Sequence, residues 1–161
     1  MALRRFTARL RAVTCPYAKV PTLALLAACL LPVTGAGAEQ AYVVRDYAIE
    51  QPLTATPGDP ARGRAVMLER ELGNCLACHA IPLDAEFPGT TGPSLAGVGA
   101  RLTPAQLRLR VVDPKRINPA TMMPAYFRSS GLNRVLPEYQ GKTILDAQQV
   151  EDVVAFLATL R

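Results

Sequence analysis

The chain has 161 residues, a hydrophobic content of 50% and a formal net charge of +5. The hydrophobic content excludes a disordered or collagen-like chain, and the length suits one domain of ordinary size. The net charge is misleading, because five of the eighteen Lys and Arg residues lie before residue 20, whereas every Asp and Glu lies at or after Glu39. From Glu39 onward, 13 basic residues balance 13 acidic ones, so a body built from this part has no general electrostatic reason to bind nucleic acid.

Residues 1–38 are typical of a secretory signal peptide. A basic stretch (residues 4–19) precedes an apolar stretch (residues 20–33), and Ala36-Gly37-Ala38 forms an Ala-x-Ala cleavage site. The apolar stretch is shorter than the roughly 20 residues that span a bilayer. We expect cleavage after Ala38, a periplasmic location and no membrane span in the mature chain. Two alternatives remain, an uncleaved amphipathic anchor and a lipid on Cys29, which ends a lipobox-like sequence.

The mature chain is predicted to begin with an extended arm and a helix. The arm covers residues 39–58, contains Pro52 and Pro57, and has enough apolar residues to pack on the body. Asp59 followed by Pro60 is an N-cap signal, and it predicts a helix through about Leu72. The helix leads toward the only two cysteines that the mature chain keeps.

Those cysteines belong to Cys75-Leu76-Ala77-Cys78-His79, and His79 is the only histidine of the chain. The pattern C-x-x-C-H is the attachment site of c-type haem. Two thiols three positions apart on one helical turn can add to the two vinyl groups of a haem edge, and the next residue places an imidazole under the iron. The motif therefore predicts one covalent haem with His79 as an axial ligand.

Other uses of these residues fit less well. A zinc site needs about four protein ligands, and the mature chain offers only three soft or imidazole donors, all adjacent. A thioredoxin-like dithiol would lie in a βαβ pattern, which is not evident. A structural disulfide between Cys75 and Cys78 would leave His79 without a role.

After the haem motif, residues 84–99 are rich in Gly and Pro and predict a loop. Within it, residues 91–95 could run their backbone beside His79. Thr103 and Gln106 then form a capping box around Pro104, which predicts a helix to about Val112.

A sixth iron ligand must come from a residue other than histidine. Met67 lies before the haem motif on what is predicted to be the same helix, so it cannot easily reach the opposite haem face. Met122 and Met123 lie in a Pro-rich stretch, and Pro124 holds Met123 in an extended backbone. We favour Met123, with Met122 as the alternative, although methionines ordinarily fill gaps in a core. The weaker donors are two lysines, Lys115 and Lys142.

The last predicted element is a helix that begins at the capping box of Asp146 and Gln149. One face of it is apolar, through Val150, Val153, Val154, Leu157 and Leu160. Together the elements predict an all-α fold of short helices and long loops around one haem. Gly63 on the first helix and Phe156 on the last are the expected contact where these helices cross.

In plan, the chain resembles class I c-type cytochromes. From about Gly73 to Arg161 it resembles more specifically the SoxX family, the small cytochrome subunits of the SoxAX complex of sulfur-oxidising bacteria. A generic cytochrome shares the haem and Met-Pro segments but lacks the Leu-Arg-Leu-Arg sequence at 107–110 and the Gly-Leu-Asn-Arg-Val sequence at 131–135. The segments that carry the resemblance are residues 73–79, 92–95, 101–103, 107–115, 118–119, 123–126, 131–135 and 148–154.

The resemblance implies a class I cytochrome c domain over residues 59–161 that binds one haem through Cys75, Cys78, His79 and Met123. It also implies a partner, the SoxA cytochrome, and a shared reaction that joins thiosulfate to a cysteine of the carrier SoxYZ. This chain would pass the electrons to a mobile cytochrome c and would have no catalytic residue of its own. The alternatives are a free-standing electron-shuttle cytochrome and a haem sensor or peroxidase-like module with an open iron site.

Overall fold

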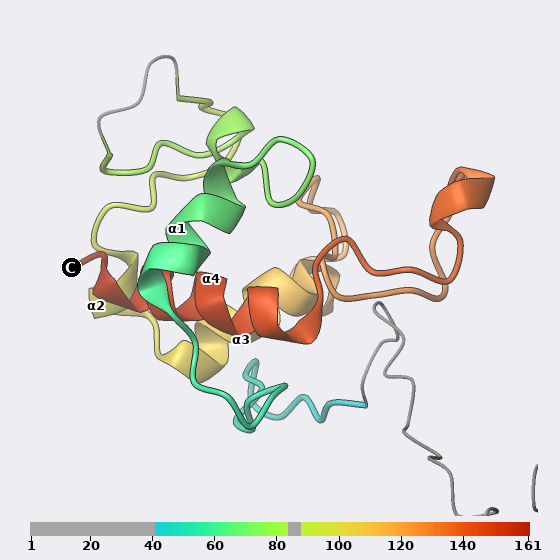
Figure 1. The fold of residues 1–161 in the computed structure, drawn as a ribbon, viewed down its shortest axis with the longest axis horizontal. Coiled ribbons are helices and arrows are strands. Elements are labelled where there is room, and N and C mark those ends of the chain that lie inside the picture. Colours follow the sequence, from blue (N-terminus) through green and yellow to red (C-terminus); the bar gives the residue numbers. More distant parts are fainter. Residues whose placement is uncertain (1–40, 84–87) are drawn as a thin grey trace, which may run out of the picture. The chain divides into compact units, whose positions relative to one another are not determined.

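The fold was obtained as a computed structural model, which describes residues 41–83 and 88–161. The predicted signal peptide, residues 1–38, lies outside these residues. The described chain forms four α-helices, and it is all-α as expected, with one isolated β-bridge and no strand (Figure 1). None of its helices is long and apolar enough to cross a membrane. The elements are α1 (Pro60–Leu68), the 3-10 helix η1 (Cys75–Ala77), α2 (Val98–Arg101), α3 (Pro104–Val112), η2 (Pro114–Arg116), η3 (Pro137–Tyr139) and α4 (Ala147–Thr159).

The helices α1 and α4 pack closely where they cross (Figure 1). A Cβ added at Gly63 of α1 would overlap the backbone carbonyl of Asp152 and lie 3.0 Å from the Cβ of Phe156. The predicted contact between Gly63 and Phe156 is therefore confirmed. It allows apolar side chains from α1, α3 and α4 to meet in one core, including Met67, Leu109 and Val150, each at most 1% exposed.

The predicted starts of α3 and α4 are confirmed, and so is the predicted end of α3. The Thr103 hydroxyl accepts from the Gln106 N–H at 3.2 Å while the Gln106 side chain accepts from the Thr103 N–H at 3.0 Å, and Asp146 and Gln149 cap α4 in the same way. The predicted end of α1 at Leu72 is wrong, because the helix ends at Leu68.

The chain turns back after α1, and this turn ends the helix early. The N–H of Gly73 donates to the Val66 carbonyl at 3.1 Å, and the N–H of Asn74 donates to the Glu69 carbonyl at 3.0 Å. Met67 therefore does not share a helix with the haem motif, which begins its own 3-10 turn at Cys75.

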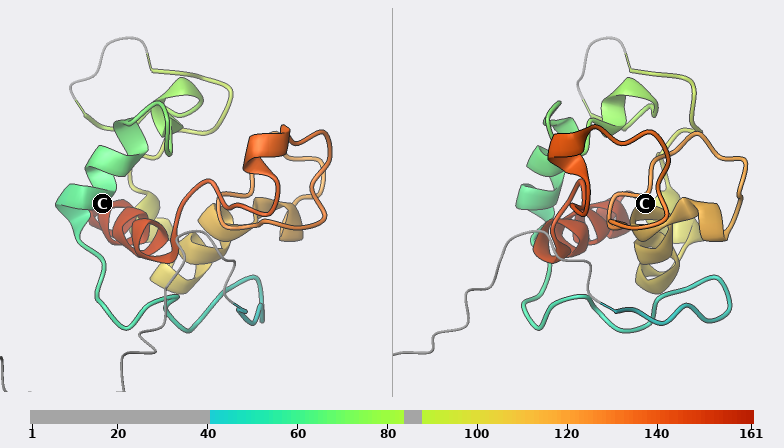
Figure 2. Two further views of the ribbon diagram at one scale, coloured as in Figure 1. Left: turned by 45° about the vertical axis from the view of Figure 1, so that its right-hand side comes forward. Right: turned by 90° about the vertical axis from the view of Figure 1, so that its right-hand side faces the viewer.

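The N-terminal arm runs along α3 and α4 (Figure 2). It makes one tight turn, where Arg45 and Ala48 exchange two backbone hydrogen bonds of 3.0 and 2.8 Å. After the turn, Ile49 is 1% exposed and its N–H donates to the Ala105 carbonyl at 3.1 Å. The expectation that the arm packs on the body is confirmed for this part, whereas Tyr47, at the turn, is exposed.

A buried ion pair joins the arm to α3 and α4. Arg108 donates through Nε and Nη2 to the two carboxylate oxygens of Glu151, at 2.7 and 2.8 Å, and both side chains are 6% exposed. Arg108 Nη1 also donates to the Ile49 carbonyl at 2.7 Å, and Glu151 accepts from the Leu53 N–H at 2.9 Å. Because all these groups are buried, each charge depends on the other for compensation.

We predict that Glu151→Gln lowers the free energy of unfolding by about 3–5 kcal/mol, since it leaves the Arg108 guanidinium buried without a countercharge. Urea unfolding of the haem-loaded protein measures this loss. The double variant Arg108→Met, Glu151→Leu serves as the control and should recover part of the lost stability, because both charges are then absent while the Ile49 carbonyl and the Leu53 N–H lose their partners. A loss below about 1 kcal/mol for Glu151→Gln would contradict the buried pair.

Candidate haem site

The C-x-x-C-H motif forms a tight turn that starts from an unusual backbone conformation. Asn74 is left-handed, with φ of 46°, and it precedes the 3-10 helix η1. The His79 N–H donates to the Cys75 carbonyl at 2.9 Å, so the turn places the two cysteines and the histidine within one helical repeat. Cys75 is half-buried, Cys78 is exposed, and both are free thiols rather than a disulfide. Both sulfurs are therefore available for attachment.

The imidazole of His79 is held by a backbone carbonyl. Its Nδ1 lies 2.7 Å from the carbonyl oxygen of Pro93. Because the carbonyl can only accept, Nδ1 carries the proton and donates, so in the neutral imidazole the lone pair is on Nε2. This is the arrangement in which a metal-ligating histidine is oriented by its second nitrogen. The expectation that residues 91–95 run beside His79 is confirmed.

Gly92 permits this close approach. A Cβ at this position would lie 2.6 Å from Nδ1 and 2.8 Å from Nε2 of His79, where no side chain fits. The Gly92 N–H donates to the Cys78 carbonyl at 2.8 Å, and two further bonds of 2.8 Å, from Gly89 to Leu76 and from Leu95 to Ala80, pair the loop with the motif. The loop is thus fastened on both sides of the imidazole.

The three candidate methionines lie in very different environments. Met67 is 1% exposed in the apolar core, whereas Met122 is 83% exposed. Met123 is partly buried and packs against the core. The neighbouring Lys115 ammonium donates to the Thr121 carbonyl at 2.7 Å, and the Thr121 hydroxyl accepts from the Met123 N–H at 3.2 Å. Of these three methionines, Met123 alone is neither enclosed in the core nor fully in solvent.

Tyr126 connects the Met-Pro segment to the haem motif, a role that its place in segment 123–126 of the sequence did not reveal. Its hydroxyl donates to the Gly73 carbonyl at 2.7 Å, in a buried position beside Cys75. Burial raises the pKa of the Cys75 thiol to about 11, although a hydrogen bond with Tyr126 opposes this rise. Burial also raises the pKa of Tyr126, and the nearby Cys75 sulfur adds a smaller rise. Both groups are therefore neutral at pH 7. An aromatic residue two places after Met-Pro was the only signal in the sequence.

The donor set fits a c-type haem. It comprises two free thiols, one imidazole with an available Nε2, and one partly buried thioether, which are the groups that such a haem uses. Within residues 41–83 and 88–161, no cluster of three or more His, Cys, Asp or Glu could hold a metal ion. The zinc alternative therefore lacks a ligand set in the described part of the chain.

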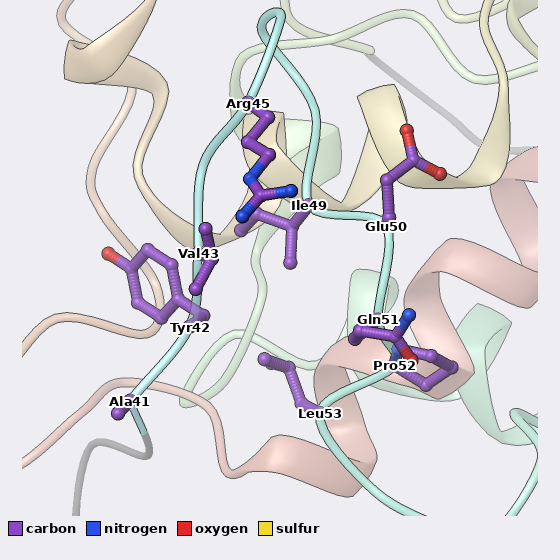
Figure 3. A pocket seen from close by; sticks show the side chains of 9 residues that line it. All are labelled: Ala41, Tyr42, Val43, Arg45, Ile49, Glu50, Gln51, Pro52 and Leu53. Atoms are coloured by element: carbon purple, nitrogen blue, oxygen red, sulfur yellow. The ribbon is translucent and has the colours of Figure 1, made fainter.

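A separate cavity of about 370 Å³ lies among the residues of the N-terminal arm (Figure 3). Arm residues between Ala41 and Leu53 line it, including Tyr42, Arg45 and Ile49. None of the four predicted haem-binding residues contributes to its wall. It is therefore distinct from the donor set described above.

Comparison with known proteins agrees with this site. The model of the Cytochrome c family matches residues 60–161. A chain in a solved structure, described as "Crystal structure of SoxXA from P. pantotrophus", is 44% identical, with a TM-score of 0.70. The match covers 78% of this chain and 98% of that one. No curated protein matches the chain.

The family match extends from the first residue of α1 to the C-terminal residue, so it contains all four α-helices and all four haem-binding candidates. The match to the SoxXA chain covers nearly the whole length of that chain. Its sequence identity of 44% is well above the identity between chains that share only a fold. The chain therefore belongs to the cytochrome c family, whose haem is covalently bound, and within that family to the SoxX cytochromes.

Proposed function

We propose that the chain is the electron-transfer subunit of a complex that oxidatively joins thiosulfate to a cysteine of the carrier SoxYZ. In this complex it accepts electrons from the site of the partner cytochrome SoxA and passes them to a mobile cytochrome c. The observation that carries the proposal is the 44% identity over 98% of a chain from a SoxXA structure. Residues 1–38 direct export to the periplasm, and residues 39–58 and 59–161 form the arm and the cytochrome domain.

Cys75 and Cys78 would hold the haem as thioethers, and His79 and Met123 would bind its iron. The hydrogen bond from Nδ1 to Pro93 supports His79, because it fixes the ring and leaves Nε2 for the iron. The partial burial of Met123, against the exposure of Met122, supports Met123. With His79 and Met123 both bound to it, the iron would have no place for a substrate, so bond formation belongs to the partner's site.

The reaction that joins thiosulfate to a cysteine releases electrons, so it requires a subunit that accepts them. Joining a cysteine thiol to thiosulfate forms one sulfur–sulfur bond and releases two electrons and one proton. When bound, the haem supplies one-electron oxidation and reduction, so the two electrons leave in two steps. A thioether ligand raises the reduction potential above that of a thiolate-ligated haem, and the family resemblance implies a cysteine-derived ligand for the haem of SoxA. Met123 therefore makes this subunit the electron sink of the pair.

We predict that Met123→Ala removes the weak far-red charge-transfer absorption of the oxidised protein, which marks an iron–thioether bond. The reduction potential should fall by on the order of 0.1 V, a fraction of the roughly 0.8 V that axial ligands span. Met122→Ala is the matched control and should leave both quantities unchanged, because its side chain is 83% exposed. Loss of the absorption in Met122→Ala instead would reassign the ligand.

A second prediction concerns the fit of the loop around His79. Gly92→Ala should force the imidazole away from Pro93, change the haem absorption spectrum and lower the free energy of unfolding by about 1–3 kcal/mol. Gly141→Ala is the control, since a Cβ there meets nothing within 4 Å. Its φ of +71° costs only about 1 kcal/mol, with no spectral change. Identical spectra for the two variants would show that Gly92 does not position the ring.

The proposed function is tested by tagging the full-length chain in thiosulfate-grown cells and purifying it with its partners. We expect a second, larger haem protein at equal stoichiometry, identified by mass and by haem staining. A monomeric cytochrome recovered alone would contradict the proposal and would favour the free-standing shuttle.

A further inference from the structure

The segment that carries Met123, residues 113–125, is a loop whose two ends are held together. It begins directly after α3, and the two residues that follow it donate their N–H groups to the last two carbonyls of α3, each at 3.2 Å. Compact surface loops with joined ends are packed by their own contacts and frequently carry function. The base of the loop is therefore fixed by backbone hydrogen bonds, and the position of Met123 depends on what holds the rest of the loop.

Polar groups inside the loop support the backbone of Met123. The Lys115 ammonium donates to the Thr121 carbonyl at 2.7 Å, and the Thr121 hydroxyl accepts from the Met123 N–H at 3.2 Å. The Asn118 side chain accepts from the Ala120 N–H at 3.0 Å. These three contacts shape the loop, but each of them joins one part of the loop to another. They do not connect it to the haem motif.

Tyr126 makes that connection through a single hydrogen bond. Its side chain is buried, with an exposed fraction of 8%, and its hydroxyl donates to the Gly73 carbonyl at 2.7 Å. Gly73 is a fixed point, because its N–H donates to the Val66 carbonyl of α1 at 3.1 Å. A Cβ at Gly73 would lie 3.2 Å from the Cys75 sulfur, so the carbonyl that Tyr126 binds belongs to a residue directly against this cysteine. The hydroxyl therefore ties the end of the loop to the haem-binding cysteine.

This hydrogen bond favours the state in which Met123 is held in place. A buried carbonyl that loses its donor costs free energy, so movement of the loop away from Gly73 is opposed. An external ligand binds the iron only in the fraction of molecules in which Met123 has left it, and its apparent affinity scales with that fraction. A contact that lowers this fraction therefore weakens every external ligand.

Such protection matters in the proposed function, in which the partner's site handles thiosulfate and a carrier thiol. Haem iron accepts a thiolate as an axial ligand, and a thiolate lowers the reduction potential that a thioether raises. An exchange of Met123 for a thiol would therefore remove the property that makes this subunit the electron sink.

We propose that the Tyr126 hydroxyl is a positioning group that keeps Met123 on the iron and so keeps small external ligands away from it. The inference rests on the proposed function, in which Met123 is an axial ligand. It assigns to one hydroxyl a role that the ring of Tyr126 alone cannot perform, since only the hydroxyl reaches the Gly73 carbonyl.

The test measures the dissociation constant of imidazole for the oxidised, haem-loaded full chain. Tyr126→Phe removes the hydroxyl and keeps the ring. Tyr139→Phe is the matched control, because this tyrosine is 59% exposed, and Glu151→Gln is a second control that lowers stability through the ion pair with Arg108. Tyr126→Phe should bind imidazole about tenfold more tightly, as the loss of one buried hydrogen bond predicts. Both controls should stay within about twofold of the wild type.

The melting temperature and the far-red absorption are recorded for each variant. Tighter binding of imidazole in Tyr126→Phe alone supports the proposal. If Tyr126→Phe binds imidazole as the wild type does, or if Glu151→Gln shows the same increase, the hydroxyl has a structural role only and the proposal is overturned, while Met123 remains the ligand. If the wild type lacks the far-red absorption, both this inference and the proposed ligand set fail. Recovery of the partner cytochrome with the tagged chain tests the proposed function separately.

Discussion

The hydrogen bond between His79 Nδ1 and the Pro93 carbonyl is the interaction on which the site depends. It decides which imidazole nitrogen carries the proton, and so which nitrogen can bind a metal. The bond needs a loop backbone close against the ring, and Gly92 supplies that space because it lacks a Cβ. A backbone carbonyl suits this position as the hydrogen-bond acceptor of His79, because its charge stays the same when the haem iron is oxidised or reduced.

The rest of the fold holds that loop and the Met-Pro segment in place. The crossing of α1 and α4 at Gly63 sets the position at which the chain enters the haem motif. Tyr126 joins the other side, since its hydroxyl binds the Gly73 carbonyl while its backbone N–H donates to Val111 at the end of α3. One side chain thus couples the segment that carries Met123 to the segment that carries Cys75.

The ion pair of Arg108 and Glu151 helps to hold the N-terminal arm on the body. Where the arm is buried, its backbone carbonyl and N–H groups need hydrogen-bond partners. Arg108 binds the Ile49 carbonyl and Glu151 binds the Leu53 N–H, so each charged group also satisfies the arm. The Leu-Arg-Leu-Arg sequence that distinguishes the SoxX family from a generic cytochrome therefore has a structural role, because its first arginine is Arg108.

Local sequence signals determined much of this protein. The C-x-x-C-H motif, the capping boxes at Thr103 and Asp146, and the apolar face of α4 are encoded over a few residues, so they could be identified without coordinates. The tertiary structure alone decided the end of α1, the burial of the ion pair and the role of Tyr126. Each of these depends on hydrogen bonds between residues whose proximity is set by the folded chain. The exposed fraction of a side chain also depends on the fold. Met122 and Met123 are adjacent residues of the same type, and they differ in exposure because the folded chain packs the core against Met123 and leaves Met122 in solvent.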